Sequence, residues 1–305
     1  MKSLRSLYVP VLVLIAGGML LPGVAGAQTE LENTIKQFSG ETAKGYVRPA
    51  ADLFGANLLA GQFRSAAIPR MGFSIALEIV GMAGVVGDDQ MTYTASTPPG
   101  FNPSSFKTAT IFGGTGATVS HASSPALTYR GADGVFDVKY MPMVAPQLRI
   151  GSVFGTEALV RLMGLPKTGN EFLPELHLLG IGLRHSISQY LPVLPLDVAA
   201  AGYYTSFTAG DMIDFKGYSI GVHASKDFAI ATVYGGVSYE RSTLSLKYNS
   251  TDPNFPGQLV DLSFDGDNAF RFTAGAGLNL AFFHLFLDVN VGNVTHFSGG
   301  IGFGM

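Results

Sequence analysis

Residues 268–305 read NAFRFTAGAGLNLAFFHLFLDVNVGNVTHFSGGIGFGM, and they alternate between apolar residues and small or polar ones. Because successive side chains of a strand point to opposite faces, the alternation predicts three strands, each with one apolar face. The apolar faces run from Phe270 to Leu280, from Leu285 to Val291 and from Phe297 to Met305, and Phe286 is the one large apolar residue on a polar face. Three such strands at the C-terminus are typical of a closed membrane barrel, whose outer face meets lipid and whose last strand pairs with its first.

A soluble antiparallel sheet with one buried face would show the same alternation. Composition favours the membrane. Charged residues make up 13% of the chain, against about a quarter in ordinary soluble domains. The 39 glycines gather on the polar faces, where small residues suit a crowded barrel interior better than a solvated surface. We therefore predict an all-β fold, a closed antiparallel transmembrane β-barrel.

Residues 1–27 have the pattern of a secretory signal peptide. Lys2 and Arg5 precede an apolar run over 9–21, and Ala25-Gly26-Ala27 offers a small-residue cleavage site. A retained anchor helix is disfavoured because Pro10 and two glycines interrupt the run. The signal and the barrel together predict location in the outer membrane of a Gram-negative bacterium. The chain has no cysteine for a lipid anchor or a disulfide.

Residues 28–63 carry a helical pattern in place of the strand pattern. A capping-box spacing begins at Thr29, so a first helix is expected to about Ser39, where Gly40 would end it. Pro49 suits the first turn of a second helix. The apolar stripe of these two helices is Leu31, Ile35, Phe38, Leu53, Phe54 and Leu58. The segment is interpreted either as a periplasmic prefix or as a plug inside the barrel, which itself spans 64–305.

Three stretches resemble a known family. They are YVRPAADLFGANL at 46–58, GTEALVR at 155–161 and GLRHSISQYLP at 182–192. They are similar to an uncharacterised Gram-negative family of predicted outer-membrane β-barrel proteins, a resemblance that covers most of the chain but implies no chemistry. A helical N-terminus ahead of a barrel of this size also resembles the long-chain fatty-acid transporter family, in architecture alone.

The whole chain predicts about twelve strands, within a range of about ten to fourteen, and bacterial barrels use an even number. The expected strands include a weaker one at 106–112 and clearer ones at 136–140 and 148–151. In the strand over 229–248 the alternation slips near Ser242, which predicts a β-bulge. With both barrel ends at the periplasm, the loops near 88–104, 164–174 and 249–267 are expected outside the cell, and 113–133 on the opposite side.

The residues give little reason to expect catalysis. The six histidines show no metal-ligand spacing, so no metal and no cofactor is expected. His223-x-Ser225 and His296-x-Ser298 resemble the pairs of outer-membrane phospholipases, but they fall on the inner face and lack the Asn-Gly that follows in that pattern. We predict that the protein is not an enzyme, and lipid hydrolysis is the least favoured alternative.

Charged residues on the predicted inner face are more informative. They are Glu78, Asp137, Lys139, Arg149, Glu157, Arg161, Arg184, Glu240, Arg271 and Asp288. The two signs balance, whereas an ion-selective porin would show an excess of one sign. We expect a lumen charge network of ion pairs that stiffens the interior, with a role in selectivity as the alternative.

These features predict passive passage or uptake of a small compound, hydrophobic compounds among the candidates, with the N-terminal helices occluding the lumen. The alternative is a barrel that conducts nothing and serves a structural or adhesive role. The expected partners are outer-membrane lipid, a small hydrophobic ligand and, through the C-terminal strand, the barrel-assembly machinery. The net charge of −3 gives no reason to expect nucleic acid.

Overall fold

The computed structural model describes residues 40–136, 138–165, 175–191, 194–249 and 257–304. The predicted signal peptide, the first predicted helix with Leu31, Ile35 and Phe38, and Asp137 lie outside the described residues. Among the described residues, no helix is long and apolar enough to cross a membrane.

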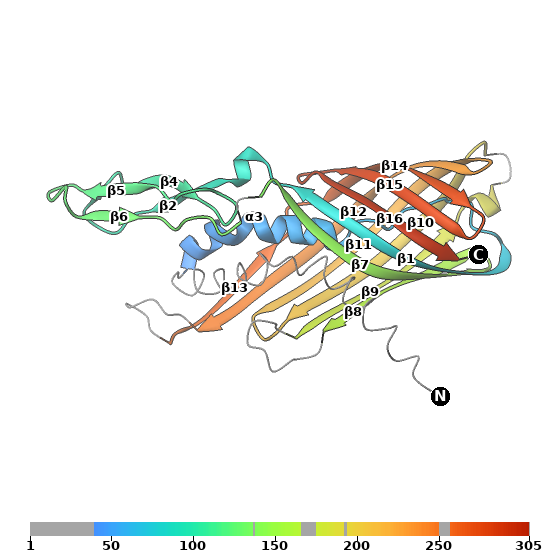
Figure 1. Ribbon diagram of the computed structural model, residues 1–305, viewed down its shortest axis with the longest axis horizontal. Coiled ribbons are helices and arrows are strands. Elements are labelled where there is room, and N and C mark those ends of the chain that lie inside the picture. Colours follow the sequence, from blue (N-terminus) through green and yellow to red (C-terminus); the bar gives the residue numbers. More distant parts are fainter. Residues whose placement is uncertain (1–39, 137, 166–174, 192–193, 250–256, 305) are drawn as a thin grey trace, which may run out of the picture.

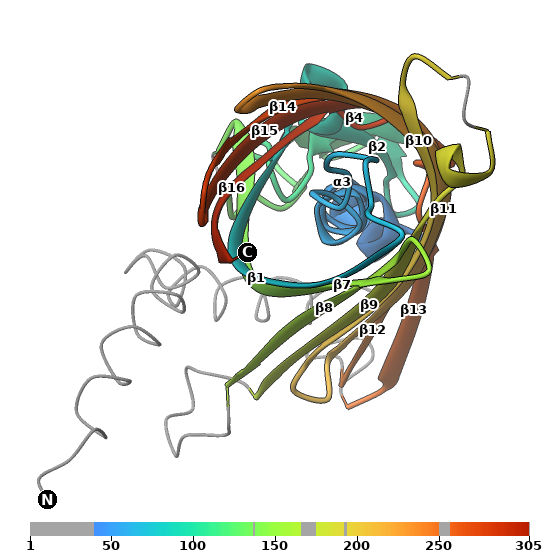
Figure 2. The ribbon, with the colours of Figure 1, turned by 90° about the vertical axis from the view of Figure 1, so that its right-hand side faces the viewer.

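Ten antiparallel strands close into a barrel (Figures 1 and 2). In ring order they are β1 (Met71–Val85), β7 (Tyr140–Val153), β8 (Thr156–Leu165), β9 (Leu176–Ser186), β10 (Asp197–Ala209), β11 (Ile213–Phe228), β12 (Ala231–Asn249), β14 (Phe270–Leu280), β15 (Phe283–Val291) and β16 (His296–Gly304). The last strand pairs with the first, from Ala76 opposite Gly304 to Gly84 opposite His296. The predicted closed all-β barrel is therefore confirmed.

The strand number is lower than the predicted twelve because residues 86–139 leave the ring as one excursion. They form a short 3-10 helix η1 (Asp88–Gln90) and two small sheets, made of β2 (Thr92–Ser96), β3 (Phe101–Asn102), β4 (Ser105–Ala109), β5 (Thr118–His121) and β6 (Thr128–Arg130). We call residues 86–139 the extension, which projects from one end of the barrel (Figure 1). The predicted strand 106–112 belongs largely to β4, and the strands predicted at 136–140 and 148–151 are replaced by one strand, β7.

The predicted β-bulge near Ser242 is absent, since β11 and β12 pair without a shift from Ile213 opposite Leu246 to Phe228 opposite Ala231. Instead β12 changes its other partner there. It pairs with β14 as far as Tyr239 and with β13 (Leu259–Asp265), the strand outside the ring, from Thr243 onward. The apolar residues of β12 beyond this point face inward because a helix lies against them, so the change of phase reflects packing and not a bulge.

The two ends of the barrel differ. At one end, which we call the turn end, tight turns at 154–155, 229–230 and 281–282 join the strands, and a longer connection with the 3-10 helix η2 (Ser188–Tyr190) follows β9. At the other, the loop end, lie the extension and the connection that contains β13. Segment 113–133 therefore lies at the same end as 88–104, contrary to the sequence expectation. The expected loop 249–267 contains β13.

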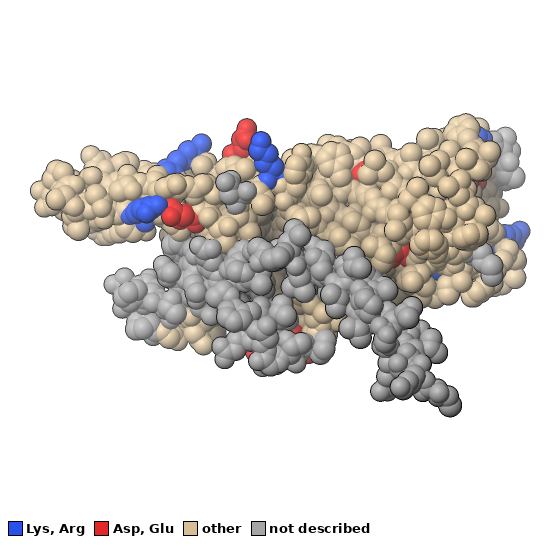
Figure 3. Space-filling model, viewed as in Figure 1, with Lys and Arg blue, Asp and Glu red and all other residues tan. Residues whose placement is uncertain are grey.

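The outer wall is apolar, as the C-terminal pattern predicts. Phe272, Leu287 and Phe303 are 63%, 66% and 55% exposed, while their neighbours Arg271 and Asp288 are buried inward. On the face shown in Figure 3, charged residues gather chiefly over the extension and towards the ends of the barrel. Such a wall is suited to lipid, which solvates apolar side chains but not charges.

In the described part of the chain, the helix α3 (Gly40–Leu58) occupies the lumen (Figure 2). The expected end of the first helix at Gly40 borders the undescribed residues, and α3 begins at Gly40. The prediction that Pro49 begins a helix is wrong, because Pro49 lies inside α3. A proline at this place removes one backbone hydrogen bond and costs about 3 kcal/mol. Burial on all sides within the barrel offsets that cost, since packing outweighs propensity in most protein helices.

Candidate functional site

The candidate site is the occupied lumen. The chain enters it at the loop end as α3, continues through residues 59–70 and reaches β1 at the turn end. We call residues 40–70 the luminal segment. Contacts at its two ends show its course through the barrel. At the loop end Tyr46 Oη donates to the Asp133 carbonyl of the extension at 2.9 Å, and at the turn end the amide of Gly155 donates to the Arg70 carbonyl at 3.1 Å.

The loop-end half of the lumen is an apolar core around α3. The Phe54 ring meets Phe207 and Phe215 edge-on, with ring centroids 5.0 and 5.7 Å apart. Leu53 and Leu58 of the predicted stripe are fully buried. Residues of α3, β1, β9, β10, β11, β12 and β13 form one cluster. Each buried leucine contributes about 1.5–3 kcal/mol relative to exposure, so hydrophobic burial anchors this half of the luminal segment.

Small residues let the helix approach the wall. A Cβ added at Gly84 of β1 would lie 2.6 Å from Leu53 Cδ2, and one added at Gly55 of α3 would lie 2.9 Å from Ser242 Oγ. Gly84 thus shows one use of the glycines predicted on the inner face, which is to let a helix pack closely against the wall. At the loop end the ring of Tyr93 lies against Gly45, and burial raises the pKa of Tyr93 to about 12, with a smaller effect from Tyr129.

The turn-end half is polar, and its wall side chains bind the main chain of the luminal segment. Arg161 donates to the Leu58 and Ala60 carbonyls at 3.2 and 3.0 Å. These are carbonyls at and just beyond the helix C-terminus, where a cation is favoured by the helix dipole.

Three further wall residues bind the same stretch. The hydroxyl of Tyr203 donates to the Gln62 carbonyl at 3.0 Å, and Arg184 donates to the Ser65 carbonyl at 3.2 Å. The hydroxyl of Ser225 accepts from the Ala66 amide at 2.8 Å. Five hydrogen bonds from four wall side chains therefore fix residues 58–66.

Charged side chains connect these contacts into one network. Glu78 pairs with Arg64 of the luminal segment at 3.0 Å and with Arg149 at 2.8 Å. Glu157 pairs with Arg184 at 2.6 Å and with Arg149 at 3.4 Å. The network thus joins β1, β7, β8 and β9 to the luminal segment.

Arg64 also explains the apolar residue on the polar face of β15. Its guanidinium carbon lies 3.1 Å from the centroid of the Phe286 ring, a cation–π contact that is strongest where water is excluded. Phe286 therefore points inward because it supports a cation of the luminal segment.

A second polar group lies across the lumen. Arg271 pairs with Glu240 at 2.7 Å, and Asn268 donates to Glu240 at 2.9 Å. Asp288 accepts from Tyr234 at 2.9 Å and from Asn290 at 2.6 Å.

Eight of the ten predicted charges face the lumen: Glu78, Arg149, Glu157, Arg161, Arg184, Glu240, Arg271 and Asp288. Lys139 does not, because it lies just before β7 and is exposed, and Asp137 lies outside the described residues. Among the described residues Arg161 has no carboxylate partner, since its bonds go to carbonyls and to Gln147. Sequence reasoning missed Arg64, which lies in an extended stretch with no periodicity to reveal its direction.

The His-x-Ser pairs serve the interior. His223 stacks on Phe63 with ring centroids 4.6 Å apart, and Ser225 binds the Ala66 amide. Ser298 donates to Asp288, and His296 is buried beside these groups with no hydrogen-bond partner among the described residues. The described part of the chain contains no group of three or more residues that could hold a metal ion.

Comparison with known proteins gives a family and a set of distant folds. The sequence model of a family described as "Family of unknown function (DUF6588)" matches residues 1–305. No curated protein matches.

Among solved structures, a loop-deletion mutant of OmpT, an outer membrane protein of Vibrio cholerae, is similar at 9% identity and TM-score 0.27, covering 77% of this chain and 98% of that one. Ail, the attachment invasion locus protein of Yersinia pestis, is similar at 12% identity and TM-score 0.26, covering 77% and 100%. The toluene transporter TodX of P. putida is similar at 11% identity and TM-score 0.27, covering 82% and 70%. Likeness at this level says nothing about what this chain binds.

Proposed function

Because the chain belongs to that family of unknown function, we propose its role from its own residues. It is a barrel of the Gram-negative outer membrane that lets a small compound pass when the luminal segment moves aside. The apolar outer wall and the C-terminal strand that pairs with the first strand support insertion into that membrane. The extension and the connection that contains β13 support an extracellular loop end, because such barrels keep short turns on the periplasmic side.

The observation that carries the proposal is the way the luminal segment is held. The wall has its own continuous ladder of backbone hydrogen bonds, closed from β1 to β16. The luminal segment adds no strand to that ring. Apolar burial around α3 holds its loop-end half, and the turn-end half is held by the Arg64–Glu78 ion pair and by side-chain hydrogen bonds, each worth about 0.5–1.5 kcal/mol net or about 1.5–3 when a charge takes part. None of these contacts belongs to the backbone ladder of the wall, so displacement of the segment is compatible with an intact barrel.

The apolar loop-end half supports hydrophobic compounds as candidates for passage. A displaced α3 would leave Phe207, Phe215 and Leu244 facing the lumen, and apolar pockets of this kind favour apolar ligands. We expect no covalent chemistry, because His223 and Ser225 are engaged in packing and in holding the segment. We also propose that the barrel-assembly machinery recognises β16. This part of the proposal rests on the apolar face of that strand.

A disulfide lock tests the proposal within one protein. A Cβ at Gly55 would lie 3.6 Å from Ser242 Cβ, within the ~3.5–4.5 Å range of disulfides, and the chain has no cysteine of its own. The double variant Gly55→Cys, Ser242→Cys should therefore join α3 to β12 when oxidised. We expect the single-channel currents of this variant in planar bilayers to vanish on oxidation. On reduction they should return to the level of the wild-type protein.

Two controls complete this experiment. Ser242→Cys alone should respond to neither treatment. Deletion of residues 29–63 behind an intact signal should give larger currents than the full-length protein, since it removes most of the luminal segment. Equal currents in the oxidised and reduced lock would contradict a moving segment.

A second candidate, a non-conducting barrel with an adhesive role, is favoured by the extension. Its two sheets project beyond the barrel (Figure 1) and add nothing to the ring. On this alternative the luminal segment is a fixed part of the interior. Two results together would favour this alternative. Neither the full-length protein nor the deletion variant would give a current, and oxidation of the double-cysteine variant would leave its thermal stability unchanged.

A further inference from the structure

Apolar side chains are exposed at all four connections of the turn end, in the residues that the structure describes. The three tight turns carry Phe154, Ile230 and Phe282 at their tips, and these side chains are 67%, 54% and 68% exposed. Turns that project into water are usually built from glycine, proline, asparagine, aspartate and serine. The connection from β9 to β10 adds four more exposed side chains, those of Tyr190, Leu191, Leu194 and Leu196.

The backbone at Phe154 shows that an apolar residue is kept at its tip against local preference. Phe154 has a φ of 50° and Gly155 a φ of 70°. The left-handed region disfavours a bulky residue, and a two-residue hairpin of this kind prefers asparagine or aspartate before the glycine. The Phe154 side chain is largely exposed, so packing within the chain does not offset the strain. Such an outlier points to a contact outside the chain.

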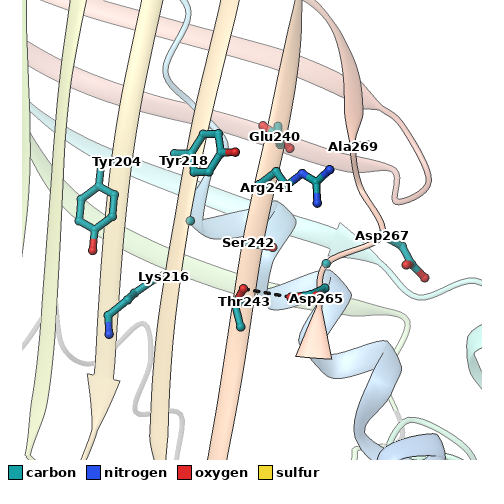
Figure 4. Close-up of a pocket in the computed structure, with 12 residues that line it drawn as sticks. Tyr204, Lys216, Tyr218, Glu240, Arg241, Ser242, Thr243, Asp265, Asp267 and Ala269 are labelled. Atoms are coloured by element: carbon teal, nitrogen blue, oxygen red, sulfur yellow. Dashed lines mark hydrogen bonds between the residues drawn. The ribbon is translucent and has the colours of Figure 1, made fainter. Parts of the chain in front are cut away.

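The height of the apolar wall places the turn end at a membrane boundary. Tyr204 and Tyr218 lie opposite each other at the far edge of this wall, and Lys216 follows towards the loop end (Figure 4). From Tyr218 to Phe228 at the turn end, β11 runs for ten residues, which is about 33 Å along the strand. At the tilt of about 40° usual in such barrels this is a height of about 25 Å, the height of their apolar band. The turn end therefore lies at the opposite edge of that band.

The connection from β9 to β10 extends the apolar surface beyond the ring. It projects sideways from the barrel at the turn end, beside β10 and β11 (Figure 2). At its start Gln189 donates to the Phe154 carbonyl at 3.2 Å. At its end the Lys226 ammonium donates to the Pro195 carbonyl at 2.9 Å. Both ends of the connection are therefore fixed to the barrel, and its sequence over 187–196 contains no charged residue.

The polar groups beside the connection suit a membrane surface. Among the described ring strands, Lys226 is the only Lys, Arg, Asp or Glu that faces outward near the turn end. A lysine can keep its ammonium at the surface of a membrane while its stem lies along apolar groups. The Tyr190 hydroxyl lies 3.0 Å from His185 Nε2, and tyrosine is typical of the level where an apolar and an aqueous phase meet.

We propose that the connection from β9 to β10 is a lipid anchor at the boundary between headgroups and acyl chains of the periplasmic leaflet. Its exposed side chains contact phospholipid acyl chains, as apolar segments at a membrane surface do to a depth of about 5–10 Å. Phe154, Ile230 and Phe282 reach the same leaflet around the rest of the ring. The anchor is continuous with the lipid-facing wall but lies outside the spanning strands. The proposal rests on the outer-membrane placement proposed above and does not depend on passage through the lumen.

A single tryptophan tests the anchor, because the chain has no tryptophan of its own. Leu191→Trp reports on the connection, Leu287→Trp on the wall and Leu127→Trp on the extension. All three leucines are exposed, so each variant should keep the wild-type shift between heated and unheated protein on gels. The full-length variants are refolded into phosphatidylcholine vesicles that carry a fluorescence quencher on the acyl chain, either near the headgroup or near the bilayer centre.

The depth of quenching gives the result. We expect the emission of Leu191→Trp to be lost mainly to the quencher near the headgroup, and that of Leu287→Trp mainly to the quencher near the bilayer centre. The emission of Leu127→Trp should respond to neither of them and should be quenched by acrylamide in the water phase.

Three results would overturn the anchor. Quenching of Leu191→Trp by acrylamide alone, with Leu287→Trp still quenched by lipid, would place the connection in water while the membrane placement stands. Quenching of Leu191→Trp by neither lipid nor acrylamide would show that protein covers the connection. Loss of lipid quenching in both Leu191→Trp and Leu287→Trp would overturn the membrane placement as well. None of these results depends on the currents of the disulfide lock, so failure here can be told apart from failure of gated passage.

Discussion

At the scale of single residues, the buried ion pairs decide how firmly the interior is held. Glu157 neutralises two guanidinium groups, Arg184 and Arg149, and Glu157→Gln would leave both without that charge. Breaking a buried pair in this way costs about 3–5 kcal/mol. Asp261→Asn, which breaks the exposed pair with Lys247, should cost about 0–1 kcal/mol. Unfolding titrations in lipid vesicles measure both free energies, and equal values would mean that water reaches Glu157.

The outer face allows an equally direct residue-level test. Leu287 is 66% exposed on the wall of β15, and Leu127 is 54% exposed in the extension. Leu287→Arg should cost about 2–4 kcal/mol if the side chain meets lipid near mid-depth. Leu127→Arg should leave stability nearly unchanged because that position is outside the wall. A smaller loss for Leu287→Arg than for Leu127→Arg in refolding titrations would place the membrane elsewhere.

Residue directions were largely predictable where a strand alternates and unpredictable where the chain is irregular. The period of two placed Glu78, Arg161 and Asp288 inward, because a single strand register fixes every side chain along it. Arg64 has no such register, so its pairing with Glu78 could be found only in three dimensions. The inward direction predicted for Lys139 is wrong for a related reason. Lys139 precedes β7, so the alternation of that strand does not apply to it.

At the scale of elements, the sequence predicted the ring better than what lies inside and outside it. The C-terminal strands β14, β15 and β16 were found because their outer face is apolar throughout. β12 was misinterpreted because α3 makes its inner face apolar beyond Ser242, a tertiary effect that local patterns cannot contain. Within the extension, 106–112 was counted as a wall strand for a similar reason, since β4 alternates like a ring strand but, among the described residues, pairs with β2 alone.

The fit of α3 to the wall provides an element-level prediction. A Cβ at Gly84 would lie 2.6 Å from Leu53 Cδ2, whereas one at Gly202 of β10 would meet nothing within 4 Å. Gly84→Val should therefore push the helix from β1 and weaken its seating by about 1–3 kcal/mol, and it should raise the open fraction in single-channel records. Gly202→Val is the matched control and should match the wild type. No difference between the two variants would mean that α3 does not limit current.

At the scale of the whole molecule, the chain runs through its own ring. α3 begins beside the extension, residues 59–70 cross the polar half, and β1 starts at the opposite end and closes the ring with β16. The luminal segment is thus bound to the wall at one end by the peptide chain itself. Twelve residues can span about 40 Å when fully extended, so α3 could move toward the loop end on this tether without breaking the ring.

The same path limits how the molecule can be made. If the ring closed first, residues 40–70 would have to thread into the closed barrel from the turn end. Closure of the β1–β16 seam around chain that is already in place needs no such passage. We therefore expect α3 to lie inside before the seam forms, so that the pairing of β1 with β16 closes the ring around the luminal segment.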